Sequence, residues 1–162
     1  MDLPVLARLK KELADLKHEL TFKIPKELQT AAAHGDLSEN AEYDAAKHRQ
    51  DFVRSRIAQL EGRVRELSMY TIASIPHGVV AYGSRVTVED VDEGESAVYE
   101  IVFPEEADAS KGQISLSSPI GRALLNKSVG DEVVVQTPSG KRTYQVVELV
   151  TLHEAQAARG DG

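Results

Sequence analysis

Apolar residues in the first 70 positions recur at helical spacing, and this pattern constrains the fold more than any other feature. Two stripes step by three and four residues: Leu6, Leu9, Leu13, Leu16 and Leu20, then Val53, Ile57, Leu60, Val64 and Leu67. Residues at this spacing share one face of an α-helix. Because a short polar stretch separates the stripes, they predict an antiparallel helical hairpin with coiled-coil packing.

Two features within the hairpin predict where the helices are interrupted. Gly35, between His34 and Asp36, is the strong break between the stripes, and glycine favours the left-handed conformation that ends a helix. Pro25 falls inside the first helix. Because proline lacks a backbone N–H and its ring collides with the preceding turn, it predicts a kink or local irregularity there.

The second half of the chain changes to strand-like runs rich in valine, isoleucine and tyrosine. These runs cover residues 85–88, 97–103, 113–116, 132–137 and 144–149. Turn-forming residues at 92–94 and 137–140 predict hairpin connections. Pro119 suits the first turn of a short helix over 119–125, which Asn126 closes in the left-handed region. We therefore expect an α+β chain whose second half is a small antiparallel sheet with one helix.

The domain boundaries follow from these changes of period. The helical hairpin is expected over residues 1–74, a linker over 75–78, the β domain over 79–152 and a frayed, flexible tail over 153–162. Charge is also divided between the halves: residues 1–74 hold as many basic as acidic residues, whereas the remainder carries the whole net charge of −7. This asymmetry predicts two parts with different functions.

Composition excludes several classes of protein. The chain is 41% hydrophobic and 28% charged, as expected of a globular protein. No apolar run approaches the roughly 20 residues of a membrane span, so no membrane partner is expected. The absence of cysteine excludes disulfides and thiolate metal sites and is consistent with a cytoplasmic protein. A net charge of −7 argues against a general nucleic-acid coat.

A cluster of carboxylates lies between the two stripes, at Asp36, Glu39, Glu42 and Asp44. Asp36 and Glu39 are spaced so that both could contact one Mg²⁺ ion, although two carboxylates alone make an incomplete site. The same spacing is that of a capping box, with Asp36 as the N-cap of the second helix and Glu39 reaching back to it. The spacing alone leaves both interpretations open.

Basic residues follow this acidic cluster. Residues 45–65 contain six: Lys47, Arg49, Arg54, Arg56, Arg63 and Arg65, against the two acids Asp51 and Glu61. A basic face beside an acidic point suits contacts with phosphate groups. Lys47, Arg49, Arg54 and Arg56 are the candidates for that contact. The alternative is an ordinary solvated helix face.

Two motifs resemble the signatures of the bacterial Gre transcript-cleavage (transcription elongation) factors, and most closely their GreA type. Residues 35–47 read GDLSENAEYDAAK, and residues 118–127 read SPIGRALLNK, followed by similar segments at 129–133, 138–140 and 144–146. The resemblance covers about residues 3–152. It implies a coiled-coil hairpin joined to a C-terminal domain of FKBP-like fold that docks on RNA polymerase.

The resemblance also implies a function. The hairpin enters the secondary channel of RNA polymerase and stimulates the polymerase's own cleavage of backtracked RNA, which rescues stalled complexes. Asp36 and Glu39 match the two central acids, which share a Mg²⁺ held mainly by the polymerase. Ser38, Glu42 and Asp44 support them. The chain itself is then not an enzyme and has no tightly bound cofactor.

The partners implied are RNA polymerase and the 3′ end of nascent RNA, and the family is also associated with DNA binding. Two other functions stay open. A Gre-like protein that occupies the same channel can instead inhibit polymerase. An FKBP-like fold alone also suggests a prolyl isomerase, although fold does not determine function.

Overall fold

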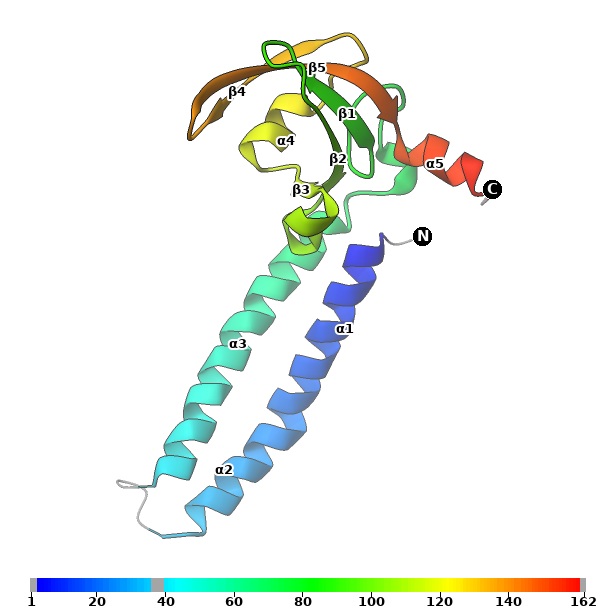
Figure 1. Cartoon of the computed structure of the whole chain (residues 1–162). Helices are drawn as coiled ribbons and strands as arrows, with labels where there is room; N and C mark the ends of the chain where they lie inside the picture. The colour runs from blue at the N-terminus through cyan, green and yellow to red at the C-terminus, as the bar shows by residue number, and fades with distance from the viewer. Residues whose placement is uncertain (1–2, 36–39, 161–162) are drawn as a thin grey trace. The chain divides into compact units, whose positions relative to one another are not determined.

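The structure is a computed structural model that describes residues 3–35 and 40–160. The chain divides into two compact units, Met1–Thr71 and Ile72–Gly162 (Figure 1). The first contains the helical hairpin and the second contains the sheet. The expected linker at 75–78 falls inside the second unit.

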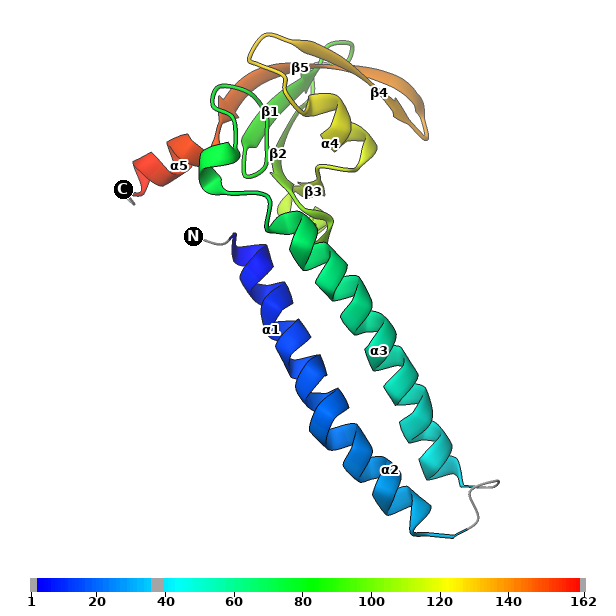
Figure 2. The same ribbon diagram turned by 180° about the vertical axis from the view of Figure 1, so that it is seen from behind.

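The first unit is an antiparallel helical hairpin, which confirms the main prediction from the sequence. Its first arm consists of α1 (Pro4–His18), the π-helical turn η1 (Glu19–Lys23) and α2 (Ile24–Ala32). Its second arm is the single helix α3 (Ala41–Leu67). Both views show the first arm running beside α3 over its length (Figures 1 and 2).

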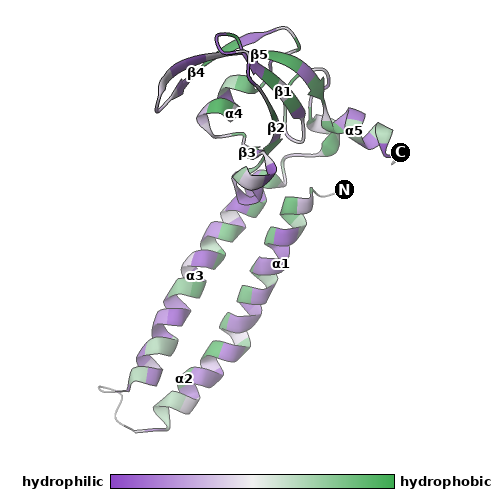
Figure 3. Cartoon of the chain, viewed as in Figure 1, coloured by the Kyte–Doolittle hydropathy of each residue, from purple (hydrophilic) through white to green (hydrophobic). Residues whose placement is uncertain are grey.

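The predicted apolar stripes form the seam between the two arms. Leu6, Leu9, Val53 and Leu60 are buried. Leu13 and Leu16, further along α1, are partly buried. Hydropathy colouring shows apolar and polar residues alternating in bands along each helix, as expected where only one side is covered (Figure 3). Burial of these side chains, at about 25 cal/mol per Å² of apolar surface, is the main stabilisation of the hairpin.

The irregularity predicted at Pro25 is present and takes the form of η1. The backbone N–H of Ile24 donates to the carbonyl oxygen of Glu19, five residues earlier, instead of four. This wider turn immediately precedes Pro25, which cannot donate a backbone hydrogen bond. The π-helical turn contains one residue more than an α-helical turn, so the first arm continues into α2 although Pro25 donates no backbone hydrogen bond.

The second unit is built on a curled sheet of five strands in the order β3-β2-β1-β5-β4. The strands are β1 (Arg85–Asp90), β2 (Ser96–Val102), β3 (Gln113–Ser115), β4 (Glu132–Thr137) and β5 (Gly140–Val150). The hairpins predicted at 92–94 and 137–140 join β1 to β2 and β4 to β5.

One prediction about the sheet is wrong, because β2 and β3 pair in parallel and the sheet is mixed. Their connection is not a hairpin turn. It contains two short 3₁₀ helices, η4 (Pro104–Glu106) and η5 (Ala109–Lys111). These turns carry the chain back toward the start of β2, so that β3 runs in the same direction as its neighbour.

The predicted short helix α4 (Pro119–Leu124) packs its Leu124 into the core formed by the buried valines of the sheet. Ser118 caps it by accepting the N–H of Gly121 at 3.1 Å. A Cβ atom on Gly121 would collide with the carbonyl oxygen of Ser115, so this close approach requires glycine. Asn126 has φ of 67°, which confirms the left-handed residue predicted after the helix.

The segment after the sheet forms helix α5 (Leu152–Ala158), whereas the sequence predicted fraying from residue 153. Thr151 caps this helix by accepting the N–H of Glu154 at 3.2 Å. The His153 ring also contacts the second unit's first segment, with its Nε2 atom 2.7 Å from the carbonyl oxygen of Ile75. Across the described residues, no helix has the length and apolar content needed to cross a membrane.

Candidate functional site

The acidic motif of residues 35–47 begins in the connection between the two arms of the hairpin and continues into the start of α3. Helix α2 ends at Ala32, and Gly35 follows with φ of 109°, in the region that favours glycine. Asp36, Ser38 and Glu39 lie outside the described residues. Glu42 and Asp44 lie in the first turn of α3, where carboxylates are stabilised by the helix macrodipole.

Asn40 fixes the start of α3. Its side-chain oxygen accepts the N–H of Tyr43 at 3.0 Å, and its amide nitrogen donates to the carbonyl oxygen of Ala31 at 2.6 Å. The N-cap of this long helix is therefore Asn40, not Asp36 as the capping-box interpretation had it. Because the Asn40 side chain bonds to both arms, it joins them at a position within the acidic motif.

A second contact also bridges the arms at this end. The Nδ1 atom of His34, after α2, lies 3.2 Å from the Oε2 atom of Glu42 in α3. Both side chains are exposed, so this pair contributes at most about 1 kcal/mol. Glu42, expected to support the acidic motif, is thus engaged with His34.

The four basic candidates of α3 do not form one patch. Lys47 and Arg54 are seven residues apart and share one side of the helix, as do Arg49 and Arg56. The two pairs differ by two residues, which is a rotation of about 200°. They therefore lie on opposite flanks of the buried seam, and an RNA strand on one flank meets only one pair.

Arg49 and Arg56 make ion pairs across the hairpin. Arg49 donates to Glu19 through its Nε and Nη2 atoms, at 2.6 and 2.9 Å. Arg56 donates to Glu12 through the same two atoms, at 3.0 and 3.3 Å. The hydrogen bond from Arg49 holds the pKa of Glu19 below its ordinary value. The Arg49 guanidinium also lies 5.2 Å from the centre of the exposed Phe52 ring. These two arginines have a structural task as well as a positive charge.

The other flank of α3 presents Lys47 and Arg54. Lys47 donates to the side-chain oxygen of Gln50 at 3.2 Å. Arg54 is exposed and has no partner among residues 3–35 and 40–160.

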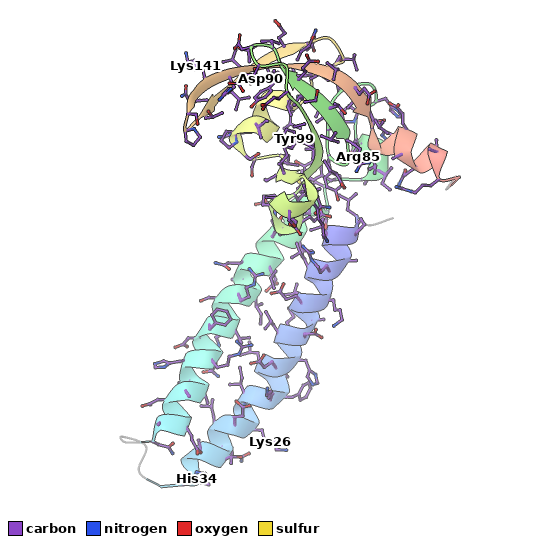
Figure 4. All side chains as sticks on the ribbon, in the orientation of Figure 1. Lys26, His34, Arg85, Asp90, Tyr99 and Lys141 are labelled. Carbon is purple, nitrogen blue, oxygen red and sulfur yellow. The ribbon has the colours of Figure 1, made fainter. Side chains whose placement is uncertain are left out.

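A groove of about 560 Å³ runs between α2 and α3 on the flank that holds Arg49. Lys23 and Lys26 line it from the first arm, facing Arg49 and Glu42 on the second (Figure 4 labels Lys26). Lys23 and Lys26 were not among the predicted basic candidates. Their spacing of three residues, which places both on one side of the first arm, was the signal that could have identified them.

The described residues contain no group of three or more histidine, cysteine, aspartate or glutamate side chains that could hold a metal ion. The two carboxylates of Asp36 and Glu39 have the donor chemistry that Mg²⁺ prefers. Mg²⁺ requires about six oxygen ligands, so two carboxylates fit it only as part of a shell completed by other groups.

Comparisons with known proteins identify the family. A model described as "Transcription elongation factor, N-terminal" matches residues 5–68, and one described as "Transcription elongation factor, GreA/GreB, C-term" matches residues 75–151. The chain is 43% identical over 149 residues to the transcription elongation factor GreA of Anaeromyxobacter sp. (strain K), covering 92% of this chain and 90% of the relative. The chain belongs to the GreA/GreB transcription elongation factor family.

Other members are similar to a comparable degree. The GreA of Pseudomonas syringae pv. tomato is 44% identical over 142 residues, covering 87% of this chain and 90% of the relative. Among solved structures, GreA factor homolog 1 of Thermus thermophilus is 32% identical, covers 90% of this chain and 94% of its own, and has a TM-score of 0.41. The expected DNA binding finds no support in these descriptions.

Proposed function

We propose that this GreA/GreB family member inserts its helical hairpin into the secondary channel of RNA polymerase and stimulates the polymerase's own cleavage of backtracked RNA. It acts in the cytoplasm as an activator and is not itself a nuclease. Its partners are the polymerase and the extruded 3′ end of the nascent RNA. The second unit, with its acidic sheet, serves as the docking module.

The position of the acidic motif is the observation that carries this proposal. The motif lies where the two arms of the hairpin meet, at the end of a 27-residue helix. At about 1.5 Å per residue, α3 alone spans about 40 Å. A rigid arm of this length, closed at its end by Asn40, suits delivery of carboxylates into a narrow channel.

Asp36 and Glu39 are the residues that would contact Mg²⁺ in the complex. The ion, when bound, supplies Lewis-acid activation of water and of the phosphate. The chain contributes two negative charges to a shell that polymerase carboxylates begin. Ser38 lies between them in the sequence, and Asp44 adds negative charge at the start of α3.

The groove between α2 and α3 supports a contact with the extruded RNA. Lys23, Lys26 and Arg49 bring three positive charges to the groove, against the two carboxylates of Glu27 and Glu42 that also line it. Arg49 is at the same time paired with Glu19, and Lys23 lies 3.9 Å from Glu27. Arg54 and Lys47 offer two more on the opposite flank. Phosphate contacts of this kind bind RNA without regard to sequence.

The experiment that tests the proposal uses RNA polymerase stalled in a backtracked complex with 5′-labelled RNA. Adding the wild-type chain is expected to shorten the RNA. Asp36→Asn and Glu39→Gln each remove a charge with little change in volume, so each should lower the cleavage rate by at least about tenfold while polymerase binding is kept. Asp51→Asn is the matched control, because Asp51 is an exposed carboxylate on α3 away from the motif.

Two further assays of the wild-type chain, one of RNA synthesis and one of proline isomerisation, separate the other two functions. A wild-type chain that binds polymerase and slows RNA synthesis without shortening the RNA would be a channel-occupying inhibitor. A chain that shortens no RNA and catalyses isomerisation of a proline-containing peptide would be a prolyl isomerase. Either result would overturn the proposal.

A further inference from the structure

A second groove, of about 350 Å³, lies within the second unit and is not used by the proposed cleavage function. The β1–β2 and β4–β5 hairpins form it. Asp90 and Tyr144 are directly paired across β1 and β5, and Tyr99 lies on β2, on the same core-facing side of the sheet. Figure 4 labels Asp90 and Tyr99 on these neighbouring strands.

The groove is negatively charged. Asp90, Glu93 and Glu95 line it together with the single cation Arg142. Arg142 is already engaged by two of the three carboxylates, at 3.3 Å from Asp90 and 2.8 Å from Glu93. The backbone N–H groups of Glu93 and Asp92 hold the pKa of Asp90 below its ordinary value, so this buried carboxylate stays ionised at neutral pH.

Glu95 is the carboxylate of the groove that is available to a partner. Its side chain is exposed and has no partner within residues 3–35 and 40–160. Because Asp90 and Glu93 together exceed the charge of Arg142, the groove keeps a surplus negative charge even before Glu95 is counted. A cation entering the groove therefore meets Glu95 without first having to break an existing ion pair.

Two tyrosine hydroxyls also lack partners. Tyr99 and Tyr144 are partly buried against the core, yet neither hydroxyl makes a hydrogen bond to any described residue. In the same unit, the Tyr82 hydroxyl donates to Glu106 at 2.9 Å. Neither hydroxyl is buried away from solvent, so both are open to a group that enters the groove. Burial raises the pKa of Tyr99, so this hydroxyl stays protonated and neutral.

The chemistry of this groove selects one kind of group. Aromatic faces attract a cation, carboxylates pair with it, and neutral phenol oxygens accept its hydrogen bonds. An anion would be repelled. A purely apolar side chain would leave the tyrosine hydroxyls and Glu95 unsatisfied. A lysine ammonium or arginine guanidinium satisfies all of them, and its aliphatic stem can lie along the tyrosine rings.

We infer that the groove bounded by Glu95, Tyr99 and Tyr144 receives a lysine or arginine side chain from a basic segment of RNA polymerase. This inference rests on the proposed function only in naming polymerase as the partner. It gives the negative second unit a defined point of attachment. The contact is expected to fix the position of the second unit, while the hairpin performs the cleavage function.

Binding of the full-length chain to purified polymerase tests the inference. Glu95→Lys places a positive charge in the groove and should weaken binding by about tenfold or more, because like charges then face each other. Glu89→Lys is the matched control. Glu89 is exposed on the same strand as Asp90 but points to the opposite face of the sheet. Glu89→Lys therefore makes the same change in net charge outside the groove. Equal weakening by both variants overturns the inference.

A second pair of measurements identifies the contact. Tyr99→Phe combined with Tyr144→Phe removes only the hydroxyls and should weaken binding about two- to tenfold without changing the melting temperature. A photoreactive phenylalanine at position 99 should crosslink to a polymerase peptide that contains lysine or arginine. Unchanged binding of the double variant, or a crosslink to a segment without either residue, contradicts the inference.

These results separate failure of the inference from failure of the proposed function. A wild-type chain that binds polymerase through the groove but shortens no RNA overturns the cleavage function and leaves the inference standing. Variants that bind and cleave as the wild type does overturn the inference alone. A wild-type chain that does not bind polymerase overturns both.

Discussion

At the scale of single residues, Asn40 has two roles that the spacing of the acidic motif did not reveal. An aspartate followed three residues later by a glutamate is a strong capping pattern, so Asp36 was the natural candidate for the N-cap. The helix begins later, and Asn40 caps it. Asparagine is as good an N-cap as aspartate, and Glu42 and Asp44 after it are typical of a first helical turn. The bond to Ala31 joins the arms and has no signal in the local sequence.

We predict that Asn40→Ala weakens both the hairpin and RNA cleavage. The change leaves the N–H of Tyr43 and the carbonyl oxygen of Ala31 without their partner. The free energy of unfolding should fall by about 1–2 kcal/mol. Cleavage of backtracked RNA should fall as well, because the acidic motif is no longer held between fixed ends. Urea unfolding followed by circular dichroism and the RNA-shortening assay measure the two effects.

Two further variants separate the roles of Asn40. Asn40→Asp keeps the cap acceptor but replaces the donor to Ala31 with a carboxylate oxygen, so any loss of stability that it causes reports the contact across the arms and not the cap. Gln59→Ala changes an exposed position on α3 and should have little effect on either measurement. Wild-type stability of Asn40→Ala would show that the contact across the arms contributes nothing.

At the scale of elements, what could be predicted depended on how local the determinants are. The seam of the hairpin could be predicted because its apolar residues are spaced three and four positions apart. The structure buries or partly buries those positions. Pairing of β2 with β3 depends on where the connection through η4 and η5 returns the chain, which local pattern does not encode. Helix α5 had a readable signal in Thr151 and Glu154, which are spaced as a capping box.

The basic residues of α3 show the same limit. Their number was clear from the sequence. Which of them lie on which flank could be predicted only once the position of the buried seam on α3 was known. Glu19 and Arg49 are 30 residues apart in the chain, so predicting their ion pair required the register of the two arms. Long-range ion pairs of this kind cannot be predicted from one helix alone.

We predict that the Glu19–Arg49 pair makes hairpin stability depend on pH in the acid range. Hydrogen bonding to Arg49 lowers the pKa of Glu19 in the folded state. Its stabilisation is therefore present above the unfolded-state pKa of about 4.3 and is lost as pH falls through the lower folded value. Glu19→Gln should lower the free energy of unfolding by about 0.5–1 kcal/mol at pH near 7.

Chemical denaturation at neutral pH and near pH 3 measures this effect. The difference between wild type and Glu19→Gln should shrink as pH falls, and should reach zero only below the lowered pKa of Glu19 in the folded state, where Glu19 is protonated. Asp15→Asn serves as control, since Asp15 forms an exposed pair with Lys11 within one helix and should contribute at most a few tenths of a kcal/mol. A difference that persists at low pH would assign the loss to packing instead of charge.

At the scale of the whole molecule, the net charge of −7 conceals two different distributions. The hairpin half is neutral in sum: four of its twelve acidic residues lie within residues 36–44, which contain no basic residue, and its twelve basic residues lie along the two arms. The sheet half carries the negative charge, including the groove around Glu95. This division suits the proposed function, in which the two units contact different parts of one partner and a basic face of the hairpin contacts RNA.

The last prediction concerns the chain without its partner. Mg²⁺ prefers a nearly octahedral shell of about six oxygens, and a two-metal phosphate reaction needs a second ion about 4 Å away. In the proposed complex, Asp36 and Glu39 would supply two ligands for one such shell. Incubated with 5′-labelled RNA and Mg²⁺, the purified chain should therefore leave the RNA intact on a denaturing gel. Wild-type polymerase in a backtracked complex should restore shortening, whereas a polymerase lacking its own metal-binding carboxylates should bind the chain and show none. RNA shortened by the chain alone would make it a nuclease and would place a complete metal site within these 162 residues.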